Sequence, residues 1–143
     1  MIRTATERDI PELVVLLETL GYPRDEEFVR DKLEVYATSD SAHVLVDARE
    51  DAAVGFLVLD VQLLFHQEGN IGCIMAMAVL DEWRGRGVGT ALVREAERIA
   101  RQAGCVKISV ASGIHRTETH RFYRSLGFEE ITKRFVKQLG LPN

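Results

Sequence analysis

Apolar residues recur along the chain with two different spacings, which predict helices and strands. Spacing of three and four residues, typical of one helix face, runs through residues 10–20, 25–37, 87–103 and 118–127. Apolar runs typical of strands occupy residues 2–5, 42–49, 53–65, 70–80, 106–111 and 128–139. The predicted order is β-α-α-β-β-β-α-β-α-β, without an internal repeat or a linker.

Turn and capping residues mark the expected helix ends. Asp9 is expected to cap the first helix, which has Pro11 in an early turn and ends at Gly21. The helix over residues 87–103 should bury Val88, Leu92, Ile99 and Ala103, and Gly104 should stop it.

The connections between these elements predict an α/β fold with a mixed sheet. The three consecutive strands over residues 42–49, 53–65 and 70–80 have short connections and should be antiparallel neighbours. The helix over residues 87–103 links two strands as a crossover, which makes those strands parallel. We therefore expect a mostly antiparallel sheet with helices on both faces, and a ligand cleft where the strand over residues 70–80 ends.

Length and composition restrict the class of protein. The chain has 143 residues, the size of one domain, so we expect a single domain over 1–143. Hydrophobic residues make up 46% and charged residues 28%, which indicates a folded globular protein. The net charge of −4 argues against nucleic acid as a partner and mildly favours amine-bearing partners.

Two further features bear on location and metals. Cys73 and Cys105 give neither a disulfide framework nor a zinc spacing, so we expect a reducing cytoplasm and no metal. The first ten residues contain no apolar signal core. The longest apolar run, Ile71–Leu80, is far shorter than the roughly 20 residues that cross a bilayer, so we expect no membrane segment.

A glycine-rich turn precedes the helix over residues 87–103. A helix N-terminus carries unpaired N–H groups and a partial positive charge, and glycines let an anion approach this backbone. Arginines and a threonine add cationic and hydroxyl side chains. The sequence therefore predicts a phosphate or pyrophosphate site at Arg84, Gly85, Arg86, Gly87, Gly89 and Thr90.

Two familiar phosphate motifs do not fit this turn. A P-loop needs lysine after its last glycine, but Thr90 and Ala91 follow Gly89. A dinucleotide-binding motif would need glycine at position 90 and an acidic residue at the end of the next strand, which instead ends in VASG.

A third pattern fits. Arg84, Gly87 and Gly89 match the signature R/Q-x-x-G-x-G/A, and the chain resembles the GNAT N-acetyltransferase superfamily along essentially its whole length. The segment THRFYRSLGFEE, residues 119–130, is similar to the closing segment of that family. The resemblance implies a GNAT-like acyl-CoA N-acyltransferase fold and acetyl-CoA as the acetyl donor.

The resemblance also implies where acetyl-CoA lies. Its pyrophosphate would lie on the glycine-rich turn, and its pantetheine arm along the preceding strand, where a backbone N–H would bond the thioester carbonyl and the developing oxyanion. Arg116 stands where the family often has asparagine. The predicted cofactor-binding residues are Met77, Ala78, Val79, Arg84, Gly85, Arg86, Gly87, Val88, Gly89, Thr90 and Arg116.

Tyr123 matches the tyrosine of the family and is the predicted proton donor to the leaving thiolate. Phe122 and Leu126 would face the core while Tyr123 faces the cleft. The alternative interpretation is that this aromatic ring only packs against the cofactor sulfur. A phenol with a pKa of about 10 is a weak acid for protonating a thiolate whose thiol has a pKa of about 8.5.

The general base is not assigned by the sequence. The strand IGCIMAMAVL contains no acid, although many relatives carry a catalytic glutamate there. His66, Glu68, His115, Glu118 and His120 are candidates, and each has an alternative as a solvated side chain. Trp83 is expected to pack under the glycine-rich turn or at the edge of the core.

The predicted activity is transfer of an acetyl group from acetyl-CoA to a primary amine of a small molecule or of a protein, by direct attack on the thioester. We expect the acceptor at residues 19–28 and at the hairpin over residues 64–70, with Tyr22, Tyr36 and Glu68 as candidates. The alternative is a non-catalytic acyl-CoA-binding regulatory domain. Apolar strands and the habit of the family are compatible with a homodimer.

Overall fold

The computed structural model describes residues 1–111, 117–131 and 134–142. The chain divides into two compact units, residues 1–111 and 112–143. No helix in the described part of the chain is long and apolar enough to cross a membrane.

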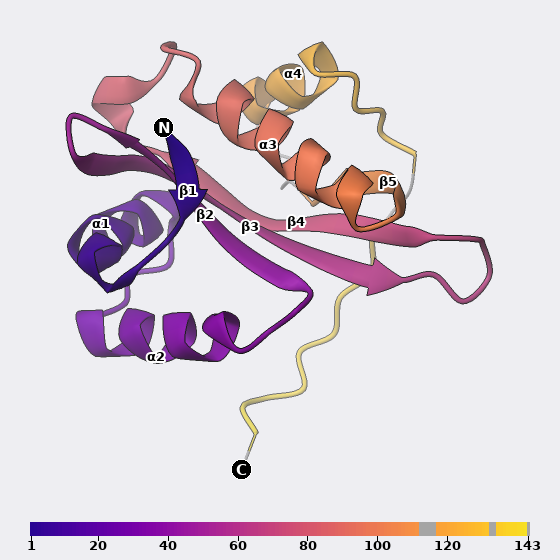
Figure 1. Cartoon of the computed structure of the whole chain (residues 1–143), viewed down its shortest axis with the longest axis horizontal. Coiled ribbons are helices and arrows are strands. Elements are labelled where there is room, and N and C mark those ends of the chain that lie inside the picture. Colours follow the sequence, from indigo (N-terminus) through magenta and orange to yellow (C-terminus); the bar gives the residue numbers. More distant parts are fainter. Residues whose placement is uncertain (112–116, 132–133, 143) are drawn as a thin grey trace. The chain divides into compact units, whose positions relative to one another are not determined.

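The first unit contains a five-stranded sheet in the order β1-β2-β3-β4-β5 (Figure 1). The first four strands pair antiparallel, and β4 and β5 pair parallel. These directions are the predicted ones for β2 to β5. The strands are β1 (Ile2–Thr4), β2 (Ala42–Arg49), β3 (Ala52–Leu63), β4 (Asn70–Val79) and β5 (Cys105–Val110).

Helices cover both faces of this sheet. In Figure 1, α1 and α2 lie on one face and α3 on the other. The predicted helices are present within a few residues of their expected ends. The helical elements of this unit are η1 (Glu7–Asp9), α1 (Ile10–Leu20), α2 (Glu26–Ala37), η2 (Asp81–Trp83) and α3 (Val88–Gln102).

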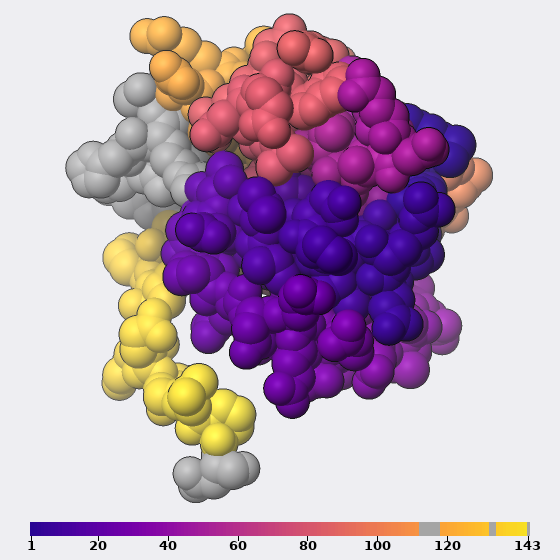
Figure 2. Space-filling view, turned by 90° about the vertical axis from the view of Figure 1, so that its left-hand side faces the viewer, coloured from indigo at the N-terminus to yellow at the C-terminus, as the bar shows by residue number. Residues whose placement is uncertain are grey.

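The core under α1 and α2 joins these helices to three strands. Figure 2 shows α1 and α2 side by side on this face of the unit, in indigo and violet. Their apolar residues pack against alternate residues of β2, β3 and β4. The buried members are Ile10, Leu13, Leu16, Val29, Val46, Ala53, Phe56 and Ala78.

On the opposite face, α3 lies close to the sheet at two glycines. A Cβ at Gly55 would stand 2.7 Å from a methyl carbon of Val88, and one at Gly72 would stand 3.2 Å from the Cβ of Ala100. These contacts fix the rotation of α3 about its own axis. Burial at Val88 and Leu92 is confirmed, together with Val93, Ala96 and Ala100. Burial at Ile99 and Ala103 is wrong: Ile99 is only half-buried, and Ala103 is exposed because it is the C-cap, beyond the last helical residue.

The predicted cap at Asp9 also differs from the structure. Its carboxylate accepts from Arg3, at 2.7 and 2.8 Å, and from the N–H of Thr6, at 2.8 Å, and makes no capping bond to α1. Asp9 therefore joins η1 to β1. Asp25 does cap its helix, because its carboxylate accepts from the N–H of Phe28 at 2.8 Å.

The second unit contains α4 (Thr117–Ser125), as predicted. The strand expected over residues 128–139 is absent from the described residues, 128–131 and 134–139. A strand needs a hydrogen-bonded neighbour, and the alternation of charged and apolar residues cannot supply one. Ile131, Phe135, Val136 and Leu139 are exposed.

Candidate active site

The candidate site begins where β4 separates from β5. The two strands pair only from Asn70 to Ile74 on β4, opposite Cys105 to Val110 on β5. Beyond Ile74, β4 continues to Val79 and pairs with β3 on its other side. Within the described residues, the edge over residues 75–79 therefore pairs with no strand.

A β-bulge at Met75 accompanies this separation. Ile74 stands opposite Leu59 and Ala76 opposite Val58, which leaves Met75 as an extra residue on β4. The bulge exchanges the two faces of the strand. Gly72 faces α3 before it, whereas Ala76 packs against the α1 and α2 core after it.

The backbone direction after the bulge follows from one hydrogen bond. The N–H of Leu80 donates to the carbonyl of Val54 at 2.9 Å, so this N–H points to β3. Because N–H groups alternate along a strand, the N–H of Ala78 also points to β3. The N–H groups of Met77 and Val79 point to the open edge.

The glycine-rich turn connects this strand end to α3. Gly85 and Gly87 have φ of 76° and 82°, in the left-handed region, and a Cβ on either would meet no atom within 4 Å. These two glycines are needed for their backbone conformation, in addition to the access that the sequence suggested. Gly87 is the N-cap of α3.

The start of α3 carries N–H groups that no bond within the helix uses. The first helical bond runs from Ala91 N–H to Gly87 carbonyl, at 3.0 Å, so the N–H groups of Val88, Gly89 and Thr90 precede the helical ladder. The first turn of α3 contains no acidic residue. The side chain of Val88 is buried, which leaves only its backbone for a ligand.

The arginines of the turn lie on its surface with local partners. Arg84 pairs with Asp81 at 3.3 Å, and both side chains are exposed. The guanidinium of Arg86 lies 4.7 Å from the ring centre of Trp83. Trp83 is half-buried beside the turn, in agreement with the expected packing role.

These parts supply two sets of backbone donors, one at the open edge of β4 and one at the start of α3. An extended edge at Met77 and Val79 leads through η2 and the glycine-rich turn to the start of α3. The edge suits an extended ligand with amide groups, and the helix start suits an anion. A molecule that combines a pantetheine arm with a pyrophosphate fits this donor set.

Tyr123 belongs to the second unit. Its ring contacts the rings of Phe122 and Phe128 edge to face, with centres 5.1 and 5.4 Å apart. The expectation for helix faces differs from the structure, because Tyr123 is buried whereas Phe122 and Leu126 are half-buried. The role of Tyr123 as proton donor stays a prediction.

The proposed bases divide into two groups. His66 and Glu68 lie in the hairpin between β3 and β4, before Asn70. Met77 lies seven positions after Asn70 along β4, or roughly 20 Å, so neither side chain reaches Met77. Figure 1 shows this hairpin and η2 at opposite ends of the sheet. The part of the acceptor site that the sequence places in this hairpin lies at the same distance from Met77, and its role stays a prediction.

The second group comes from the second unit. Glu118 is exposed and His120 half-buried in α4, while His115 and Arg116 lie outside the described residues. Tyr22 is exposed after α1, and Tyr36 is half-buried in the last turn of α2. The roles of these residues stay predictions.

Burial raises the pKa of the Cys105 thiol, and nearby Cys73 raises it further, so Cys105 is a poor nucleophile at neutral pH. Within the described part of the chain, no group of three or more histidine, cysteine or acidic side chains could hold a metal ion.

Comparison with known proteins agrees with this geometry. Residues 10–128 match the acetyltransferase (GNAT) family. The chain is 32% identical to the aminoalkylphosphonate N-acetyltransferase of Salmonella typhimurium, over 96% of this chain and 90% of that protein. It is 28% identical to the aminoglycoside N(6′)-acetyltransferase type 1 of Stenotrophomonas maltophilia, over 94% and 89%.

A solved structure shows the same fold. An aminoglycoside N-acetyltransferase in complex with CoA superposes with a TM-score of 0.85 at 18% identity, over 96% of this chain and 93% of that chain. The family match covers most of the chain, including β4, the glycine-rich turn and α4. The chain belongs to the acetyltransferase (GNAT) family and is an N-acetyltransferase.

Proposed function

We propose that this protein transfers the acetyl group of acetyl-CoA to the primary amine of a small molecule. The observation that carries the proposal is the open edge of β4 leading into the start of α3. Acetyl-CoA supplies the activated acetyl group as a thioester. Met77 and Val79 bind its arm through backbone N–H groups, and one of them donates to the thioester carbonyl.

The glycine-rich turn binds the pyrophosphate. The N–H groups of Gly87, Val88, Gly89 and Thr90 donate to its oxygens, and the helix dipole favours the negative charge. Arg84 and Arg86 supply positive charge near the turn. The N–H of Ala78 points to β3, so Ala78 contributes to the site only as part of the strand along which the arm lies.

The chemistry requires little from the side chains of the enzyme. A neutral amine attacks the thioester carbon directly, so no enzyme nucleophile is needed. As the C–S bond breaks, Tyr123 donates a proton to the sulfur of the leaving thiolate; the proton lost by the attacking nitrogen passes through solvent and restores the phenol. The two units act together as one N-acetyltransferase domain, and the family match supports this because it runs across the boundary between them.

The names of the relatives support a small-molecule acceptor. One relative is named for aminoalkylphosphonates and the other for aminoglycosides, and both proteins align over nearly their whole lengths. A panel of amines from these two classes, with a lysine peptide as the protein-like acceptor, should identify the acceptor by release of free CoA. Preference for the peptide would contradict the small-molecule proposal.

Binding of CoA is the direct test of the site. We expect Gly87→Glu to weaken CoA binding at least tenfold in isothermal titration, because it adds a negative charge where the pyrophosphate lies. Gly21→Glu is the matched control. Gly21 also has positive φ, 102°, and a Cβ at this position would also meet no atom within 4 Å.

The two variants have the same net charge and comparable backbone strain, so a difference between them reports on the site. Equal CoA affinity in Gly87→Glu and Gly21→Glu would contradict the assignment of the turn. Absence of CoA binding in the parent protein would contradict the proposed function. A homodimer and a cytoplasmic location stay predictions.

A further inference from the structure

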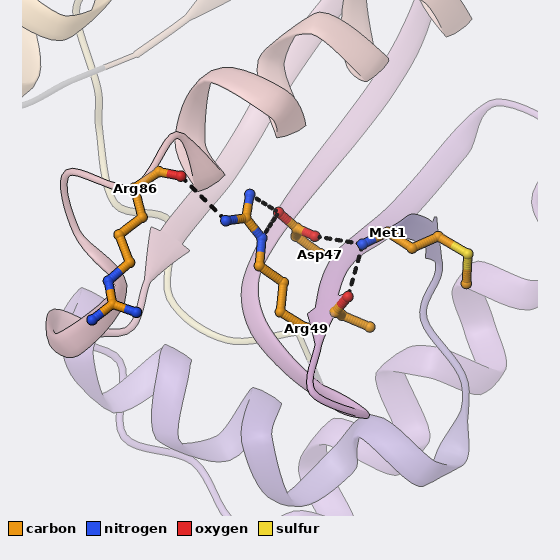
Figure 3. Close-up of polar contacts among 5 residues, drawn as sticks. Met1, Asp47, Arg49 and Arg86 are labelled. Atoms are coloured by element: carbon orange, nitrogen blue, oxygen red, sulfur yellow. Dashed lines mark hydrogen bonds and ion pairs between the residues drawn. The ribbon is translucent and has the colours of Figure 1, made fainter.

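Arg49, at the end of β2, connects a buried carboxylate to the glycine-rich turn. Its Nη2 and Nε lie 3.0 and 3.2 Å from Oδ2 of Asp47, and its Nη1 donates to the carbonyl of Arg86 at 3.2 Å (Figure 3). The guanidinium also lies 5.7 Å from the ring centre of Trp83.

The carboxylate end of this connection is fixed. Asp47 is 1% exposed, and its other oxygen accepts from the amino group of Met1 at 3.1 Å. A buried carboxylate holds its cationic partners, because losing one leaves the charge poorly compensated. Arg49 is therefore anchored in the sheet of the first unit rather than free in solvent.

At the other end, the hydrogen bond from Arg49 to the carbonyl of Arg86 sets the direction of the peptide group between Arg86 and Gly87. In a trans peptide the C=O and the following N–H point in opposite directions. Because the carbonyl of Arg86 points to Arg49, the N–H of Gly87 points away from it. Gly87 has φ of 82°, and glycine adopts either sign of φ at little cost. Without a restraint, this peptide could therefore turn over.

We propose that Arg49 is a positioning residue for acetyl-CoA, which keeps the Gly87 N–H, rather than the Arg86 carbonyl, directed at the pyrophosphate. This inference rests on the proposed function. A reversed peptide would place a carbonyl oxygen against an anion and would remove one donor. The residue acts through the turn and does not touch the ligand.

Three variants test this role. Arg49→Met keeps the length of the side chain and removes both sets of hydrogen bonds, so CoA affinity should fall roughly tenfold. Arg49→Lys keeps the charge but cannot bridge Asp47 and Arg86 equally well, so its affinity should be intermediate. Arg3→Met is the matched control, because Arg3 pairs with buried Asp9 and belongs to β1.

Isothermal titration with CoA gives the affinities, and the ¹⁵N amide resonance of Gly87 reports on the peptide itself. In the parent protein this resonance should shift when CoA is added. In Arg49→Met at saturating CoA the shift should be reduced, whereas in Arg3→Met it should be retained.

Each alternative result has a defined meaning. If the parent protein does not bind CoA, the proposed function fails before this inference is reached. If the parent binds and Arg49→Met binds equally well, the positioning role is wrong. The role is also wrong if Arg3→Met loses as much affinity, or if Arg49→Met loses affinity with an unchanged Gly87 shift, which would indicate direct contact with the ligand.

Discussion

At the scale of single residues, a left-handed backbone conformation limits which residue types a position accepts at little steric cost. Gly85 and Gly87 use it in the turn that precedes α3, at positions where glycine is the favoured residue. Glu50 and Asp51 adopt it without being glycine, with φ of 55° and 64°. They form the two-residue turn between β2 and β3, directly after Arg49.

This turn leads to a stability prediction. Asp51→Gly should stabilise the protein by about 1 kcal/mol, because glycine removes the steric cost of positive φ in a tight hairpin. Thermal denaturation should show a midpoint higher by about 3 °C. Asp40→Gly is the control, because Asp40 is exposed and is not among the described residues with positive φ; it should give no gain.

At the scale of elements, an ion pair joins the first strand to the first helical turn. Arg3 of β1 is held by both carboxylate oxygens of Asp9 in η1. Burial raises the pKa of Asp9, but hydrogen bonds from Arg3 and from the N–H of Thr6 lower it more, so the pKa stays below its ordinary value. The charged carboxylate therefore stabilises the folded state.

The sign of this pKa shift predicts a pH dependence. A lowered pKa contributes stability that is present above the ordinary carboxyl value, about 4, and is lost as the pH falls through the folded value. Asp9→Asn should cost roughly 2 to 4 kcal/mol at pH 7. The difference between parent and variant in urea denaturation should shrink below pH 4.

A control separates this pair from surface charges. Glu7 forms an exposed pair with Arg30 at 3.6 Å, so Glu7→Gln should change stability by less than about 0.5 kcal/mol at any pH. A difference between the parent and Asp9→Asn that does not change between pH 7 and pH 3 would contradict the assignment to the Asp9 carboxylate.

Elements were also the level at which the sequence was most informative. Periodicity and turn residues predicted β1 to β5 and α1 to α4, because each has a regular pattern of its own. The bulge at Met75 could not be predicted. Every residue from Ile71 to Leu80 is apolar or glycine, so a change of face does not alter the pattern of apolar and polar residues.

Residues that depend on tertiary position were predicted less well. His66 and Glu68 suited a base by residue type, but only the pairing of β3 with β4 shows how far they lie from Met77. The pair of buried Asp47 and half-buried Arg49 also escaped detection, because charged residues two positions apart near a hairpin usually lie on the surface.

At the scale of the whole molecule, the proposed reaction uses residues of both units. The binding surface at β4 and α3 belongs to residues 1–111, and Tyr123 belongs to residues 112–143. Removing the hydroxyl of Tyr123 should therefore change transfer of the acetyl group more than binding of CoA, and the two can be measured separately.

Tyr123→Phe tests the second part. It removes the hydroxyl but keeps a ring that can contact Phe122 and Phe128. If Tyr123 donates the proton, kcat should fall about a hundredfold with little change in KM for acetyl-CoA. A kcat within about threefold of the parent, measured by CoA release with the preferred amine, would instead support a packing role.

The bulge at Met75 also constrains how this strand can evolve. Because one extra residue exchanges the two faces of β4, a codon gained or lost nearby would exchange them again along the rest of the strand. Replacing one apolar residue by another does not change which face of the strand each residue lies on. In β4, therefore, the number of residues is more strictly constrained than their identity, and alignments of relatives should show substitutions here but few gaps.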